Sequence, residues 1–102
     1  MVKKNFFLVL FCLANSCSQN KNTTIIKLAH SLDVTHPVHK AMVYMSDRVK
    51  QRSGGKMIVD IYPGGQLGNE RELIELLQIG SLGMTKVSTA PLEGFIPDMK
   101  IF

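Results

Sequence analysis

The segment from Ser53 to Ser88 constrains the fold of this chain more than any other part. In order, it contains the signals of a helix stop, a strand, a glycine-rich turn, a capped helix, a second glycine stop and another strand. Strands that alternate with helices of this length predict parallel βαβ units with right-handed crossovers. We therefore expect an open α/β sheet whose ligands bind at the carboxyl ends of its strands.

Short local signals predict where the elements begin and end. Thr35 or His36 can cap a helix whose first turn accepts Pro37, because that turn does not use the missing N–H. Asn69, followed three residues later by Glu72, forms a capping box for the next helix. The expected elements are a strand at 25–30, a helix at 37–53, a strand at 57–62, a helix at 70–79 and a strand at 83–88.

The first residues have the pattern of an export signal. Residues 1–17 contain a basic start and an apolar run at 6–14, which is shorter than the roughly 20 residues of a membrane span. Two outcomes stay open: ordinary cleavage that leaves Cys17 first, or a lipoprotein signal in which Cys17 is lipidated. We expect residues 18–24 to be a polar tether and residues 25–102 to form the folded part.

Cysteine content and charge exclude several classes of function. Cys12 and Cys17 are the two cysteines, and both lie in or beside the leader, so the folded part has no disulfide pair and no thiolate site. The cations of segment 48–56 surround an expected helix end, where they favour the macrodipole. We interpret them as a solvated helix end, because no aromatic interleaving or nucleic-acid motif accompanies them.

Other chemistries lack the residues they need. The glycine turn at 64–68 has no G-K-[ST] after it, so we expect special backbone angles and no nucleotide site. His36 and His39 have the spacing of helical metal ligands, but a donor set of three or four is missing. We expect them to be a structural pair at a helix start, and we expect no metal and no cofactor. No strained serine elbow or placed carboxylate pair indicates catalysis.

Two strand ends carry polar residues that could meet a solute. His30 ends the first expected strand, and Ser88 with Thr89 ends the third. The carboxyl ends of parallel strands share one edge of a sheet, where open α/β folds hold ligands. The structural alternatives are a buried histidine at residue 30 and an ordinary capping pair before Pro91.

From about residue 26 to residue 102 the chain resembles the extracytoplasmic solute-binding subunits of TRAP transporters, of the DctP type. Six short segments carry this resemblance, and they are specific in combination. They are L-A-H at 28–30, H-P-V-H-K-A at 36–41, S-G-G-K at 53–56, Y-P-G-G-Q-L-G at 62–68, E-R-E-L-I at 70–74 and S-T-A-P-L at 88–92.

The resemblance implies a periplasmic or extracytoplasmic receptor with two α/β lobes that closes on an organic acid. Such a receptor delivers its carboxylate ligand to membrane-embedded TRAP subunits and binds no nucleic acid. Ligand contacts from this lobe would come from His30, Ser31, Ser88 and Thr89. The carboxylate would be held by an arginine of the other lobe, since guanidinium binds carboxylates in bidentate geometry.

The resemblance also implies that the chain is the N-terminal part of the first lobe. We therefore expect an incomplete βαβαβ sheet, a strand beginning at residues 99–102, and no competence to bind alone. One alternative is an exported, membrane-anchored interaction module that presents residues 91–102 to a partner. Another is a non-functional remnant of a truncated receptor gene. A small hydrolase or nucleotide-dependent enzyme rests on fold analogy alone.

Overall fold

The fold is organised around strand β1 (Thr24–Ala29), which lies between two parallel neighbours. Strand β2 (Met57–Tyr62) pairs with the whole of β1, from Thr24 opposite Met57 to Ala29 opposite Tyr62. Strand β3 (Met84–Thr85) pairs with the last two residues of β1 on the other side. The sheet order is therefore β2-β1-β3, and the expected α/β fold with a parallel, open sheet is confirmed.

The computed structural model describes residues 22–101. The expected leader at 1–17, with Cys17, lies outside the described residues, as does most of the expected tether. Thr24, which we placed in the tether, already belongs to β1. Among residues 22–101, no helix is both long enough and apolar enough to cross a membrane.

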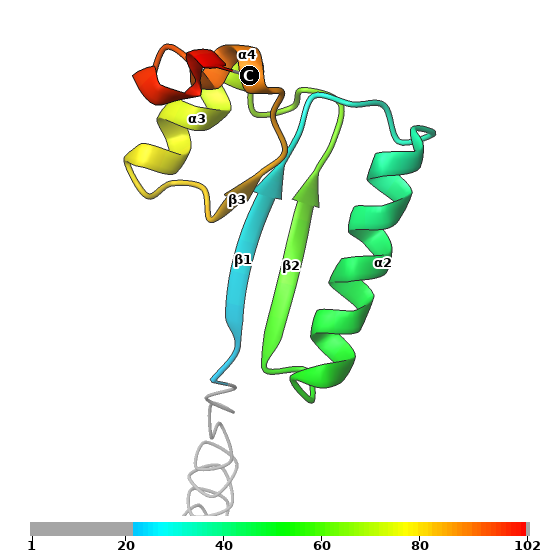
Figure 1. Ribbon diagram of the computed structural model, residues 1–102. Helices are drawn as coiled ribbons and strands as arrows, with labels where there is room; N and C mark the ends of the chain where they lie inside the picture. Colours follow the sequence, from blue (N-terminus) through cyan, green and yellow to red (C-terminus); the bar gives the residue numbers. More distant parts are fainter. Residues whose placement is uncertain (1–21, 102) are drawn as a thin grey trace, which may run out of the picture.

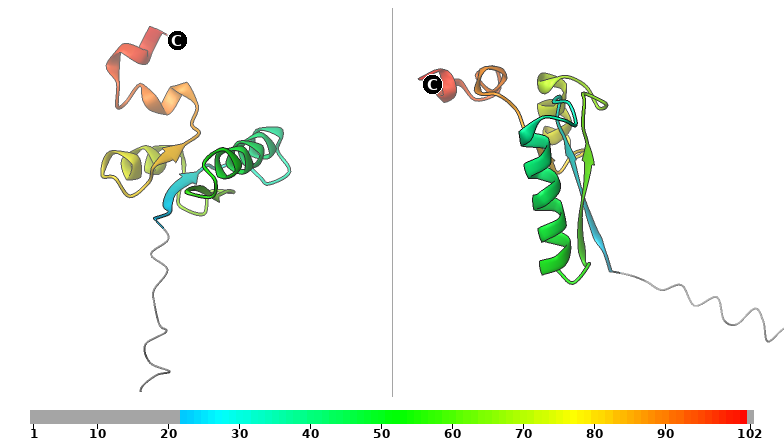
Figure 2. Two further views of the ribbon diagram at one scale, coloured as in Figure 1. Left: turned by 90° about the horizontal axis from the view of Figure 1, so that it is seen from below. Right: turned by 90° about the vertical axis from the view of Figure 1, so that its right-hand side faces the viewer.

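Two helices cover opposite faces of the sheet (Figures 1 and 2). Helix α2 (Pro37–Arg52) packs its Met42 against Leu28 and Val59. Helix α3 (Glu70–Gln78) places Leu73 with Ala29 and Leu82 in a second cluster on the other face. Successive residues of a strand point to opposite faces, so the neighbours Leu28 and Ala29 anchor one core each.

The expected apolar stripe of α2 is only partly buried. Met42 is buried and Met45 and Val49 pack against the same cluster, whereas Val38 and Ala41 are exposed. The contacts of α2 with the sheet core are therefore made by residues from Met42 onward.

The predicted start and stop signals operate as expected. The Nδ1 atom of His36 accepts a hydrogen bond from the Val38 amide at 3.1 Å, so His36 is the N-cap of α2. Asn69 and Glu72 form both hydrogen bonds of the capping box of α3. Gly54 ends the α2 turn with a φ of 62°, in the left-handed region that glycine adopts without steric cost.

The last third of the described chain differs from expectation. The third strand is two residues long, and its last contact with β1 is the Lys86 amide at 3.4 Å from the Ala29 carbonyl oxygen. The chain then leaves the sheet, and helix α4 (Thr89–Leu92) follows. The expectation of a strand beginning at residues 99–102 is wrong, because Pro97–Ile101 forms the 3₁₀ helix η2, with the Met99 amide bonded to the Ile96 carbonyl oxygen.

The backbone at Gly68 is adapted to the capping box that follows it. Its φ is 122°, and a Cβ atom added there would lie 2.9 Å from the Cβ atom of Glu72. At Gly94 the nearest atom to an added Cβ is the Pro91 carbonyl oxygen, at 3.7 Å. The two glycines therefore differ both in backbone conformation and in available space.

We expect Gly68→Ala to lower the free energy of unfolding by about 2 kcal/mol, because the new methyl group strains the backbone and displaces Glu72 from the cap. Gly94→Ala, as the control, should change it by less than about 0.5 kcal/mol. Urea unfolding followed by far-UV circular dichroism measures both changes. Equal stability of the two variants would contradict the role assigned to Gly68.

Candidate ligand-binding site

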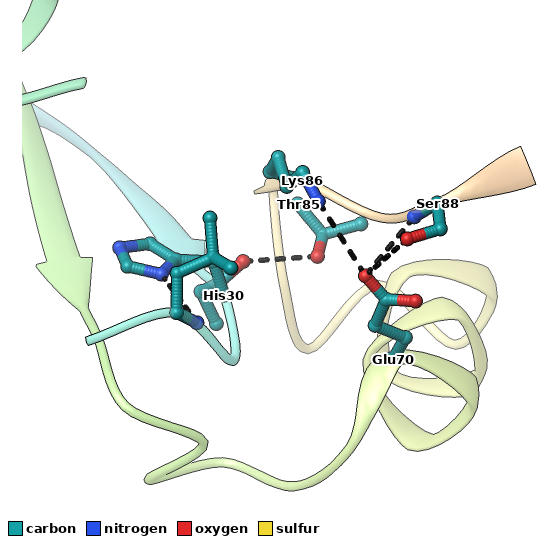
Figure 3. Close-up of polar contacts among 7 residues, drawn as sticks. His30, Glu70, Thr85, Lys86 and Ser88 are labelled. Atoms are coloured by element: carbon teal, nitrogen blue, oxygen red, sulfur yellow. Dashed lines mark hydrogen bonds and ion pairs between the residues drawn. The ribbon is translucent and has the colours of Figure 1, made fainter. Parts of the chain in front are cut away.

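The carboxyl ends of β1 and β3 lie side by side and bring the predicted site residues to one edge of the sheet. The Ala29 carbonyl oxygen accepts a hydrogen bond from the Thr85 hydroxyl at 2.9 Å. Figure 3 shows His30 on one side of this contact and Ser88 on the other. We call His30, Ser31, Ser88 and Thr89, with the backbone that joins them to the strands, the rim.

The backbone after β1 is held by the glycine turn after β2. The His30 amide donates to the Tyr62 carbonyl oxygen at 3.1 Å, and the amide of Gly65 donates back to the His30 carbonyl oxygen at 3.1 Å. The amide of Gly64 donates to the Leu32 carbonyl oxygen at 2.9 Å. This turn, expected only to need special backbone angles, therefore also positions residues 30–32.

His30 is fully buried, and both of its ring nitrogen atoms have partners. Its Nδ1 atom accepts from the Leu32 amide at 3.1 Å, so the neutral ring carries its proton on Nε2. That Nε2 atom lies 3.0 Å from Nδ1 of His39, which must then act as acceptor. The relative exposure of His30 is 0%, so within the described chain it positions the rim, and direct contact with a solute stays a prediction.

The two other histidines separate into different roles. We expected His36 and His39 to form a structural pair at the helix start. Instead His36 caps α2, while His39 turns toward His30, with the ring centroids 5.1 Å apart. Among residues 22–101, no group of three or more metal-binding side chains is placed to hold an ion.

The predicted serine and threonine residues of the rim are exposed. Ser31, Ser88 and Thr89 all lie on the surface. Ser88 occupies the N-cap position of α4, but its side chain makes no hydrogen bond to the helix. The hydroxyl group of Ser88 therefore does not cap α4. Such hydroxyl groups can donate to and accept from the polar atoms of a small solute.

Glu70 lies next to the rim and contacts it, which the sequence did not indicate. One of its carboxylate oxygen atoms, Oε1, accepts from the Ser88 amide at 3.0 Å and from the Ser88 hydroxyl at 3.1 Å. The same oxygen lies 3.6 Å from the ammonium nitrogen of Lys86 (Figure 3). Its only signal in the sequence is an acidic residue in the first turn of a helix, which the macrodipole favours in any case.

The electrostatics of the rim keep His30 neutral. Burial lowers the pKa of His30 from its ordinary value of 6.5, and the nearby His39, Lys86 and His36 lower it further. A proton added to Nδ1 of His30 would also remove the acceptor of the Leu32 amide. Neutral imidazole is therefore part of the geometry of the rim.

We expect the free energy of unfolding to fall as the pH is lowered from about 7.5 to about 5. Because the pKa of His30 is lowered in the folded state, the unfolded chain binds the proton first. The stabilisation is complete above 6.5, the ordinary pKa, and is lost as the pH falls through 6.5 toward the lower folded value.

Urea unfolding at several pH values measures this loss, and the NMR shift of the Leu32 amide reports the titration locally. His36→Asn is the matched control, since asparagine also caps helices and the buried pair is untouched. The variant should retain most of the pH dependence of the unmodified chain, because His36 contributes least among the groups that lower the pKa of His30. A stability that does not change over this range, with a Leu32 shift that does not move, would contradict the assignment.

Comparison with known proteins identifies the family of the chain. The family model of bacterial extracellular solute-binding proteins, family 7 (DctP), matches residues 28–102. The chain is 40% identical over 79 residues to the uncharacterized protein YiiZ of Salmonella typhimurium, covering 78% of this chain and 24% of that protein. It is 31% identical over 74 residues to the C4-dicarboxylate-binding protein DctB of Bacillus subtilis, covering 72% of this chain and 21% of that protein.

A solved structure shares the fold. The TRAP periplasmic solute-binding protein of Citrobacter koseri, crystallised with D-glucuronate, matches with a TM-score of 0.76 and 36% identity, over 78% of this chain and 27% of that one. The chain thus spans about a quarter of the length of the proteins it matches. On the extent of the family match and the shared parallel sheet, the chain belongs to the DctP family of bacterial extracellular solute-binding proteins.

Proposed function

We propose that this chain supplies one side of the ligand cleft in an extracytoplasmic receptor, which binds an organic acid and delivers it to the membrane subunits of a TRAP transporter. The observation that carries the proposal is the meeting of the β1 and β3 ends, which gathers exposed hydroxyl groups at one sheet edge. Ligands of open α/β folds bind outside that edge. The relatives' ligands, D-glucuronate in one and a C4-dicarboxylate in another, support an organic acid.

In this proposal Ser31, Ser88 and Thr89 contact the ligand, and His30 holds the backbone of residues 30–32 in place. The ligand carboxylate is bound by an arginine that lies outside residues 22–101. Arg71 is engaged elsewhere, 3.5 Å from Glu75 and over the ring of Phe95. Two further arginines, Arg48 and Arg52, line a pocket near the carboxyl end of α2, away from the rim.

The remaining parts of the proposal concern chemistry and location. The family consists of solute-binding receptors, and we propose that the chain binds its ligand without converting it. We further propose that residues 1–17 direct export and that residues 18–23, which precede β1, act as a tether. After export, Cys17 either carries a lipid anchor or is the first residue left by ordinary cleavage. Mass spectrometry of the mature protein distinguishes lipidation of Cys17 from ordinary cleavage.

We expect D-glucuronate to bind the chain weakly and at the rim. Because only one side of the proposed cleft is present, the dissociation constant should lie in the range of about 1 mM or above. In NMR spectra of the 15N-labelled chain, the amide signals of Ser31, Ser88 and Thr89 should shift with added ligand, while that of Gly55 serves as an internal control.

Two results would count against the proposed function. One is a titration in which the rim signals do not move and Gly55 or its neighbours do. The other is calorimetric binding of an organic acid to the chain with a dissociation constant of about 1 μM, which would mean that no second lobe is needed.

A further inference from the structure

Glu70 contacts Ser88 of the rim and the neighbouring Lys86 through a single oxygen atom. Its Oε1 atom receives the amide and the hydroxyl of Ser88 at 3.0 and 3.1 Å, and it lies 3.6 Å from the Lys86 ammonium group. The side chain of Glu70 is 21% exposed and that of Lys86 35% exposed. Hydrogen bonds to a carboxylate are stronger than those between neutral groups, so this arrangement fixes the orientation of Ser88.

The orientation of Ser88 determines what it can offer a ligand. A serine hydroxyl has one proton to donate and two lone pairs that accept. Since its proton is directed to Glu70, the oxygen atom of this exposed residue can present only lone pairs to a solute. A ligand hydroxyl, which donates, is complementary to it, whereas a second ligand carboxylate, which only accepts, is not.

The charge of Glu70 acts in the same direction. Lys86 follows β3 directly and is close enough to His30 to lower the pKa of that imidazole. Alone, its ammonium group would attract any carboxylate bound near Ser88. The carboxylate of Glu70 cancels that charge at short range, and the start of α3 is a favourable place for it.

We propose that Glu70 is a specificity-determining residue of the rim, which favours hydroxylated monocarboxylates over dicarboxylates by making Ser88 an acceptor and by neutralising Lys86. This inference rests on the proposed function. Glu70 acts through its two neighbours and is a positioning residue. A purely structural Glu70, needed only to start α3, would change stability without changing the preference between ligands.

The test compares two probes, D-glucuronate and succinate, by NMR titration of the Ser88 amide in the full 102-residue chain. The measured quantity is the ratio of the succinate to the D-glucuronate dissociation constant. Glu70→Gln retains an acceptor for Ser88 but frees the charge of Lys86, so the ratio should fall about tenfold. Glu75→Gln, an exposed acid on the same helix, should leave it unchanged.

Lys86→Met gives a prediction of opposite sign. It leaves Ser88 bonded to Glu70 but removes the neutralising cation, so repulsion of the second carboxylate should raise the ratio several-fold. This variant decides the question if Glu70→Gln loses the dispersed spectrum of the folded chain. The unmodified protein should therefore have a ratio of dissociation constants that lies between the ratios of the two variants.

The outcomes separate the inference from the proposed function. If both probes shift Ser88 and neither substitution alters the ratio, Glu70 does not set specificity, and the receptor function stands. If neither probe moves any rim signal, the proposed function fails and the inference fails with it. A ratio that falls in Lys86→Met would also overturn the inference.

Discussion

The structure depends on the pairing of the last two residues of β1 with strands on both sides. Leu28 and Ala29 are the only residues of β1 that pair with β2 and β3 at once, among the described residues. They are also buried, at 3% and 1% exposure, and each belongs to a different core cluster. Because the three strands are parallel, this pairing brings polar residues from distant parts of the sequence to one edge.

The rim is built mainly from backbone hydrogen bonds, and few side chains are needed to shape it. Carbonyl oxygen atoms of residues 29, 30 and 32 accept from β3, from Lys86 directly after it, and from the glycine turn. The buried side chain of His30 satisfies its polar atoms locally, through Leu32 and His39. Exposed side chains such as Ser31 are thereby free to face a solute, while the groups that position them stay inside.

Local signals allowed helices α2 and α3 and the first two strands to be predicted from the sequence. The capping box of Asn69 and Glu72 involves residues three apart, so its pattern can be read directly. A third strand was expected at 83–88, but its reduction to two residues and the 3₁₀ helix η2 could not be predicted. Apolar composition does not reveal how many residues find a strand partner.

The contacts that give the site its chemistry are not local. Glu70 and Ser88 are 18 residues apart, and His39 meets His30 rather than His36, the histidine nearest to it in the sequence. Only the folded sheet brings these groups together. The sequence therefore indicated which edge would carry the site, through His30, Ser88 and Thr89, but not which side chains would orient those residues.

The hydrogen bonds from Gly64 and Gly65 to the segment after β1 have a consequence for how such a receptor can diverge. Through these bonds, the turn after β2 sets the backbone path of the loop that carries Ser31. Insertions or replacements within the turn would shift the position of Ser31 without replacing any residue that contacts the ligand. New ligand preferences can thus arise from changes in the glycine turn, with the same residues contacting the ligand.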